Sequence, residues 1–184
     1  MKQTNELLIP DYRIKHLSYF VKQSHKNLLD ISCGETKYLQ YWRWKGLSVA
    51  GTEYDDNKIT YCNSIGIPCD KLDLDDPDAK IDYDDNSFDV VTATEVLEHL
   101  KYPKLVVSEM LRVSKDLVLI TVPVFRSYWS DEHINIWQTA DRLIHDLVDI
   151  KHKDEVEIAC DVIVTKPEDW AINQRSFILA LYKK

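Results

Sequence analysis

Short apolar runs alternate with segments of helical spacing over most of this chain. Five apolar runs predict buried strands: 27–31, 47–53, 67–71, 88–92 and 117–122. Segments in which apolar side chains recur every three or four residues predict helices: 12–24, 35–45, 56–64, 103–113 and 139–150. This alternation is typical of a parallel sheet that is covered by helices on both faces.

Two late apolar runs, 156–164 and 177–182, have no long helix between them. We therefore expect an antiparallel pair at one edge of the sheet, because a parallel pair needs a long crossover. The predicted fold class is α/β: a doubly wound, mostly parallel, seven-stranded sheet with an antiparallel C-terminal edge. No repeat, linker or low-complexity tract divides the 184 residues, so we expect a single domain over residues 1–184.

The composition narrows the class of partner. A net charge of −8 disfavours binding to a phosphate backbone, so we expect a small-molecule substrate and no nucleic acid. No apolar run approaches the roughly 20 residues of a membrane span, and residues 1–10 lack a signal-peptide core, so we expect a cytoplasmic protein without membrane contact. The four cysteines have no zinc-site spacing, and the acidic tract 73–85 does not match a calcium loop; no metal site is predicted.

The loops that follow the first two predicted strands contain candidate ligand-binding residues, because ligands of such sheets bind beyond the carboxyl ends of the strands. In the first loop, Gly34 allows a ligand close to the backbone at the start of a helix. Glu53 ends the second strand 19 residues later, where a carboxylate can accept hydrogen bonds from both hydroxyls of a ribose. An ordinary strand-to-helix turn and a solvated charge are the alternatives.

Two other nucleotide-binding motifs do not match. The dinucleotide fingerprint G-x-G-x-x-G requires three glycines, whereas the chain has Ser32, Gly34 and Lys37 at those positions. The phosphate-binding motif G-x-x-x-x-G-K-[ST] is absent from the sequence. A nicotinamide-dependent oxidoreductase and an ATP- or GTP-binding protein are therefore disfavoured.

Three segments resemble the class I S-adenosylmethionine-dependent methyltransferases, in particular those of the type 11 group. Asp30-Ile31-Ser32-Cys33-Gly34 resembles their first motif, and Phe88 to Leu100, which contains V-L-E-H, resembles their fourth-strand segment. Ser108 to Val113 resembles the helix before their fifth strand. The segments 62–68 and 72–75 and this E-M-L-R-V helix are also similar to MetW, a methionine-biosynthesis protein, which we take as a relative in shape without its pathway role.

The resemblance implies a Rossmann-like methyltransferase fold, S-adenosylmethionine as cofactor and a set of binding residues. The residues that would line the methionine part are Asp30, Ser32, Cys33 and Gly34. Glu53 would bind the ribose, Asp73 and Leu74 would contact the adenine, and Thr94 would lie under the cofactor; Arg13 is a candidate for the cofactor carboxylate. Two positions depart from the family pattern, because Ser32 and Thr36 replace the usual glycines.

The predicted activity is methyl transfer from S-adenosylmethionine to a small-molecule acceptor that the sequence does not identify. His133 and His99 are weak candidates for a catalytic base, since an acceptor can require deprotonation. Glu98 and His99 can instead orient the loop, and the aromatic residues near His133 can form either an acceptor pocket or a small core: Tyr128, Trp129 and Trp137. The alternative function is a non-catalytic module that binds S-adenosylmethionine or a partner.

Overall fold

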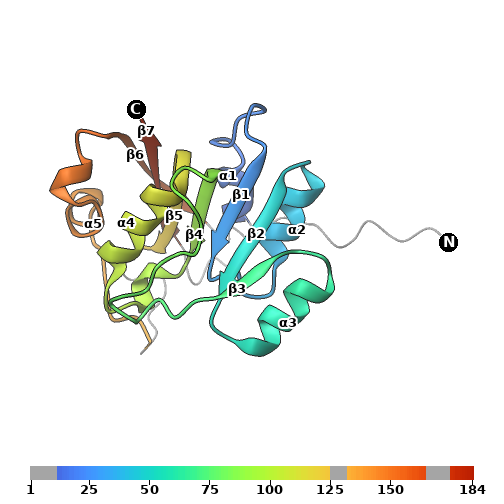
Figure 1. The fold of residues 1–184 in the computed structure, drawn as a ribbon. Helices are drawn as coiled ribbons and strands as arrows, with labels where there is room; N and C mark the ends of the chain where they lie inside the picture. The colour runs from blue at the N-terminus through green and yellow to red at the C-terminus, as the bar shows by residue number, and fades with distance from the viewer. Residues whose placement is uncertain (1–11, 125–131, 165–174) are drawn as a thin grey trace.

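A seven-stranded sheet organises the molecule (Figure 1), which a computed structural model describes over residues 12–124, 132–164 and 175–184. The strands are β1 (Asn27–Ile31), β2 (Ser48–Glu53), β3 (Cys69–Lys71), β4 (Phe88–Thr94), β5 (Ser114–Pro123), β6 (Val156–Val164) and β7 (Arg175–Lys183). The helices are α1 (Tyr12–Leu17), α2 (Lys37–Trp44), α3 (Asp56–Ser64), α4 (Pro103–Val113) and α5 (Ala140–Leu147), with short 3₁₀ helices η1 (Leu97–His99) and η2 (Ile150–His152).

The strand order is β3-β2-β1-β4-β5-β7-β6. Strands β1 to β5 run parallel, whereas β7 pairs antiparallel with both β5 and β6. The predicted α/β fold class and its antiparallel C-terminal edge are thereby confirmed. The chain builds outward from β1 to β3 and then returns to place β4 on the other side of β1. This reversal of strand order is where ligands bind in sheets of this kind.

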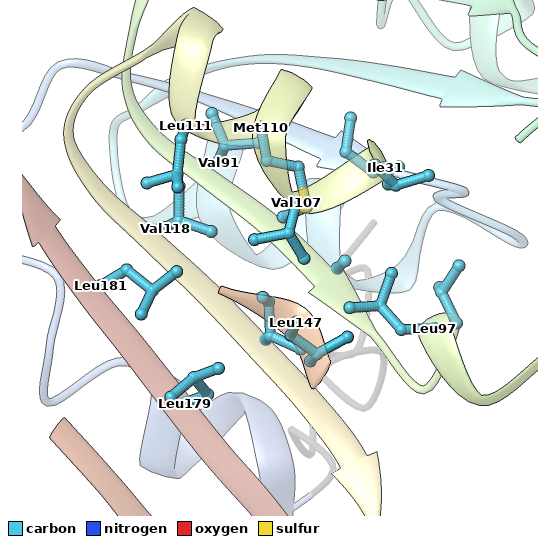
Figure 2. Close-up of a cluster of buried hydrophobic side chains, with 14 of the residues drawn as sticks. Ile31, Val91, Leu97, Val107, Met110, Leu111, Val118, Leu147, Leu179 and Leu181 are labelled. Atoms are coloured by element: carbon cyan, nitrogen blue, oxygen red, sulfur yellow. The ribbon is translucent and has the colours of Figure 1, made fainter. Parts of the chain in front are cut away.

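Two hydrophobic cores cover the two faces of the sheet. The first, which we call the α4–α5 core, includes Met110 of α4 and Leu147 of α5 (Figure 2). The second, the α1–α3 core, includes Leu17 of α1, Trp42 of α2 and Cys62 of α3. Alternate residues of β5 belong to different cores, as expected for a strand that is buried on both faces: Leu117 and Leu119 to the α1–α3 core, and Val118, Ile120 and Val122 to the α4–α5 core.

The first helix is shorter than predicted, because it ends at Leu17 rather than at residue 24. Beyond it the backbone forms tighter turns, and the ring of His25 accepts a hydrogen bond from the Lys22 amide and lies 2.7 Å from Asp116. Phe20 and Val21 still pack against the α1–α3 core, which explains their helical spacing.

The third strand begins at Cys69 rather than at residue 67. The amides of Ile65 and Ile67 both bond to the carbonyl of Cys62, so these residues finish α3 instead of joining the sheet.

Within the part of the chain that the structure describes, no helix has the length and apolar character needed to cross a membrane.

Candidate functional site

A cavity of about 620 Å³ lies at the carboxyl ends of β1, β2, β3 and β4. Its size is in the range of pockets for small molecules and cofactors. Most of the predicted cofactor residues line it: Ser32, Gly34, Glu53, Asp73, Leu74 and Thr94. His99 lines it as well, whereas Asp30 and Cys33 are buried and are not part of its lining.

Glu53 organises the wall between the first two loops. One oxygen of its carboxylate accepts the Gly34 amide at 2.8 Å, and the other accepts the amides of Tyr54 at 2.9 Å and Asp55 at 3.2 Å. The side chain is only 5% exposed, yet it borders the cavity. Its position is therefore fixed before any ligand arrives, and the free lone pairs of its oxygens can accept further hydrogen bonds.

Three residues of the first loop have a left-handed backbone conformation, which glycine adopts most easily. Two of them, Ser32 and Thr36, are not glycine. Ser32, Gly34 and Thr36 have φ values of 55°, 54° and 63°. This left-handed conformation is unusual for residues with a Cβ atom and is a genuine outlier for a β-branched residue. Thr36 is fully buried, and its hydroxyl accepts a hydrogen bond from the side chain of Gln40 at 3.0 Å. Ser32 and Thr36 thus adopt the left-handed backbone conformation that glycine favours at these positions.

Asp30 is the penultimate residue of β1, next to this loop. Its carboxylate accepts the Thr92 hydroxyl at 2.6 Å, and the residue is 3% exposed. Burial raises the pKa of Asp30 to about 7; the nearby Glu53 carboxylate adds to this rise, and the Thr92 hydrogen bond opposes it. Asp30 therefore links the end region of β1 to β4 through Thr92.

The side chain of Cys33 points away from the cavity into the α1–α3 core, where its sulfur lies 3.8 Å from that of Cys69. Burial raises the pKa of the Cys33 thiol well above its usual range, so the thiol stays protonated. A Cβ atom on Gly51 would lie 2.7 Å from the Cys33 sulfur. The glycine in β2 therefore makes room for Cys33.

Thr94 places a buried, unsatisfied hydroxyl at the cavity. Its oxygen has no hydrogen-bond partner among the described residues. Such groups are rare in proteins because leaving them unpaired costs about 1–3 kcal/mol.

Glu95 follows Thr94 with a φ of 55°, and its carboxylate lies 3.7 Å from the guanidinium of Arg13. Arg13, the candidate for binding the cofactor carboxylate, therefore pairs instead with a residue of the cavity wall.

The loop after β3 supplies another wall. Leu74 is half-buried against the α4–α5 core, while Asp73 is exposed and accepts the Asp75 amide at 3.0 Å. Several other lining residues were not predicted from the sequence: Tyr54, Lys58, Leu72, Asp75, Glu95, Val96, Leu100 and Lys101. Tyr54 and Glu95 directly follow strands β2 and β4, so the rule that selects strand ends could have found them.

The two histidine candidates lie together, with ring centroids 4.9 Å apart. His99 borders the cavity. His133, in the segment before α5, packs against the ring of His99. Burial lowers the pKa of His133, and the neighbouring His99 adds to this effect. Of the aromatic residues named with His133, Trp137 is buried in the α4–α5 core, and Tyr128 and Trp129 lie outside the described residues.

Comparison with known families and structures identifies relatives of this chain. The family model for the methionine biosynthesis protein MetW matches residues 11–140. The chain belongs to the MetW family. A search of curated proteins finds no match to this MetW-family sequence.

Solved structures share the fold of this MetW-family chain at low sequence identity. The [4+2]-cyclase SpnF has a TM-score of 0.71 at 17% identity, over 94% of this chain and 80% of that chain. A SAM-dependent methyltransferase from Archaeoglobus fulgidus has a TM-score of 0.70 at 14% identity, with 94% and 92% covered. A chain from a complex of the Haloferax volcanii Trm112 methyltransferase activator has a TM-score of 0.69 at 11% identity, with 94% and 90% covered.

These comparisons confirm the resemblance to class I methyltransferases at the level of family and fold. The similarity to MetW was expected from a few short segments. The family model extends it over residues 11–140, well over half of the chain. The structural relatives include both a methyltransferase and a cyclase, so this fold supports more than one chemistry.

Proposed function

We propose that this MetW-family chain binds S-adenosylmethionine in the cavity at the ends of β1 to β4 and transfers its methyl group to a small-molecule acceptor. The observation that carries the proposal is the convergence of four strand ends on one cavity that contains a pre-positioned Glu53 carboxylate and an unsatisfied Thr94 hydroxyl. A ligand that presents hydroxyl groups to Glu53 and a polar atom to Thr94 would satisfy both.

The residues present fit the cofactor. Glu53 would accept hydrogen bonds from the ribose hydroxyls, and the loop of Ser32 and Gly34 would lie along the methionine part. Leu74 would pack against the adenine, with Asp73 accepting from its amine. Bound S-adenosylmethionine supplies a methyl group on a sulfonium that is already a good leaving group. The protein then needs only to hold the acceptor in line and to exclude water, which is catalysis by proximity.

The acidic net charge of the chain agrees with a small-molecule acceptor. The net charge of −8 disfavours a nucleic-acid substrate. We further propose that residues 1–184 act as a single methyltransferase-like domain in the cytoplasm. His99 is the candidate base that borders the cavity, and His133 is the weaker candidate because it is not part of the lining.

Titration calorimetry with S-adenosylmethionine and S-adenosylhomocysteine tests the proposal on a matched pair of variants. Thr94→Val removes the unsatisfied hydroxyl at the cavity, and Thr121→Val removes another buried, unsatisfied hydroxyl that is not among the lining residues. Thr94 and Thr121 are neighbours across β4 and β5, so the two variants alter the same region.

We expect the Thr94→Val variant to bind S-adenosylmethionine about five- to tenfold more weakly, since one hydrogen bond contributes about 1 kcal/mol. The Thr121→Val variant should bind like the wild type. Absence of binding to the wild type, or equal losses in both variants, would refute the proposed cofactor site.

A second candidate function is a non-catalytic module that binds S-adenosylmethionine or a partner protein. The unusual Ser32 and Thr36 in the first loop, the cyclase among the structural relatives and the activator complex favour this alternative. Binding of the cofactor without methyl transfer to any member of an acceptor panel would support it. Methyl transfer to one acceptor, detected by mass spectrometry, would exclude it.

A further inference from the structure

Three metal-binding side chains meet beside the cavity. The ligand atoms of Glu98, His99 and His133 all lie within 4.8 Å of one another. Glu98 and His99 belong to η1, which follows β4, whereas His133 comes from the segment before α5. A cluster of two imidazoles and one carboxylate is a common ligand set for divalent transition metals.

Main-chain hydrogen bonds hold the two segments together. The amides of Ile134 and Asn135 donate to the carbonyl of Glu98 at 2.9 Å and 3.0 Å. The side-chain amide of Asn135 also donates to the carbonyls of Leu97 at 3.2 Å and Leu100 at 2.6 Å. These bonds therefore hold the two segments that carry the three side chains next to each other.

Glu98 places a buried carboxyl group beside His99, and the positive charge of Arg13 also acts on it. Its side chain is 2% exposed, and Oε1 lies 3.8 Å from Nε2 of His99. Its other oxygen, Oε2, is buried without a hydrogen-bond partner among the described residues. A buried charge is costly unless it is paired with an opposite charge or coordinates a metal. A bound cation would pair with the carboxylate and satisfy its unpaired oxygen.

The ring of His99 is oriented as a metal ligand would be. Its Nδ1 lies 3.1 Å from the main-chain carbonyl of Glu132, which can only accept a hydrogen bond. Nδ1 must therefore carry the proton in this contact, and Nε2 of the neutral ring presents a lone pair toward Glu98. Metal-binding histidines commonly donate their second nitrogen to a carbonyl or carboxylate in this way.

We propose that Glu98, His99 and His133 form a binding site for a divalent first-row transition-metal ion such as zinc. Ligand atoms around a tetrahedral zinc ion lie about 3.4 Å apart, so the side chains would have to rotate to bring their ligand atoms from within 4.8 Å to this spacing. Three protein ligands leave at least one position open for water or for an oxygen atom of a bound molecule. Because His99 also borders the cavity, this ion would lie at its wall. The proposal is independent of S-adenosylmethionine binding.

Titration of the metal-free protein with Co²⁺, followed by visible absorption and then by displacement with Zn²⁺, tests the site. The variants are Glu98→Gln and His133→Ala, and the matched control is His145→Ala. His145 is an exposed histidine whose ring also contacts a carboxylate, that of Asp146 at 3.1 Å. We expect one Co²⁺ per chain in the wild type and in the control, and binding at least about tenfold weaker in the other two variants.

A melting curve in EDTA verifies that each variant is folded. Glu98→Gln is the decisive variant if His133→Ala does not fold, because the glutamine keeps the shape of the side chain and replaces the carboxylate ligand with a neutral amide. Three results would overturn the proposal: no binding of Co²⁺ to the wild type, an equal loss in His145→Ala, or a thiolate-to-cobalt charge-transfer band. The last result would place the ion at the buried cysteines Cys33, Cys62 and Cys69, whose sulfur atoms also lie within 4.8 Å of one another.

Discussion

Ser32 and Thr36 adopt a backbone conformation that glycine adopts at lower cost. Left-handed φ values cost a residue with a Cβ atom roughly 1–2 kcal/mol. Thr36 recovers part of this cost through burial and its contact with Gln40, whereas Ser32 lies at the cavity and is only half-buried. Strain of this kind often accumulates at ligand sites.

Replacing Ser32 with glycine should therefore stabilise the protein. We expect the free energy of unfolding of Ser32→Gly to rise by about 1 kcal/mol, measured by urea denaturation. The control is Ser48→Gly at an exposed position of β2, where glycine should instead lower the stability by about 0.5–1 kcal/mol. A loss of stability in both variants would contradict the assigned strain.

Asp30 should make the stability of the ligand-free protein depend on pH. The folded state raises its pKa from 3.8 to about 7, chiefly by burial. The folded state thus holds a proton that the unfolded chain releases, and stability falls as the pH rises from about 4 to 7. The difference corresponds to at most about 4 kcal/mol.

The Asp30→Asn variant removes this dependence and keeps an oxygen for the Thr92 hydroxyl. We expect it to melt at a higher temperature than the wild type at pH 8 and at a similar temperature at pH 4. Melting curves over this pH range measure the difference. Parallel profiles for the two proteins would show that Asp30 does not titrate in this way.

The site residues at the ends of strands were predictable from the sequence. The site residues whose position depends on the orientation of a loop were not. Glu53 and Thr94 end buried strands, so their place at the cavity follows from the parallel sheet. Cys33 follows β1 in a turn whose direction depends on the left-handed Ser32, and its thiol points into the core. His99 and His133 are 34 residues apart, and no sequence spacing brings them together.

At the scale of elements, helix α4 holds the loop between β3 and β4 in place. Arg112 of α4 donates to the carbonyls of Ile81 and Tyr83, both at 2.8 Å, and to the carboxylates of Asp85 at 2.9 Å and Glu109 at 2.8 Å. The pKa of Arg112 is raised, first by its bond to Glu109, so the side chain stays charged. The same loop continues to Asp73 and Leu74 at the cavity.

Arg112→Lys should destabilise the protein by about 2 kcal/mol, because a lysine cannot reproduce the planar fork of a guanidinium. Urea denaturation measures this loss. Arg142→Lys on α5 is the control, since Arg142 is exposed and pairs with Asp146 at the surface, a contact that should contribute less than about 1 kcal/mol. Similar small losses for both arginines would show that Arg112 does not hold the loop.

The existence and order of the elements were predictable from apolar periodicity, but several of their ends were not. Helix α4 matches its predicted bounds because Pro103 marks its start and five buried side chains define one face: Val106, Val107, Met110, Leu111 and Val113. Helix α1 has no such start or stop signal, and the contacts of His25 with Lys22 and Asp116 decide where it ends. The contact between His25 and Asp116 joins residues far apart in the sequence.

For the whole molecule, the sequence predicted only part of the order of strands in the sheet. Continuous apolar runs in β1, β4 and β5 indicate strands that are buried on both faces. The late strands were expected as an antiparallel pair, but apolar content alone does not state which of them lies next to β5. The structure places β7 there, with six consecutive buried residues from Ser176 to Leu181.

This position of β7 sets the timing of folding during synthesis. Strand β5 ends at Pro123, and the strand that covers its outer edge begins only at Arg175. While the ribosome adds the intervening residues, the edge of β5 offers unpaired amides and carbonyls beside the apolar side chains of the sheet. Exposed edges of this kind invite pairing with other chains. The nascent chain is therefore most vulnerable to aggregation in this interval, and chaperones that bind apolar strands should engage it between these two points.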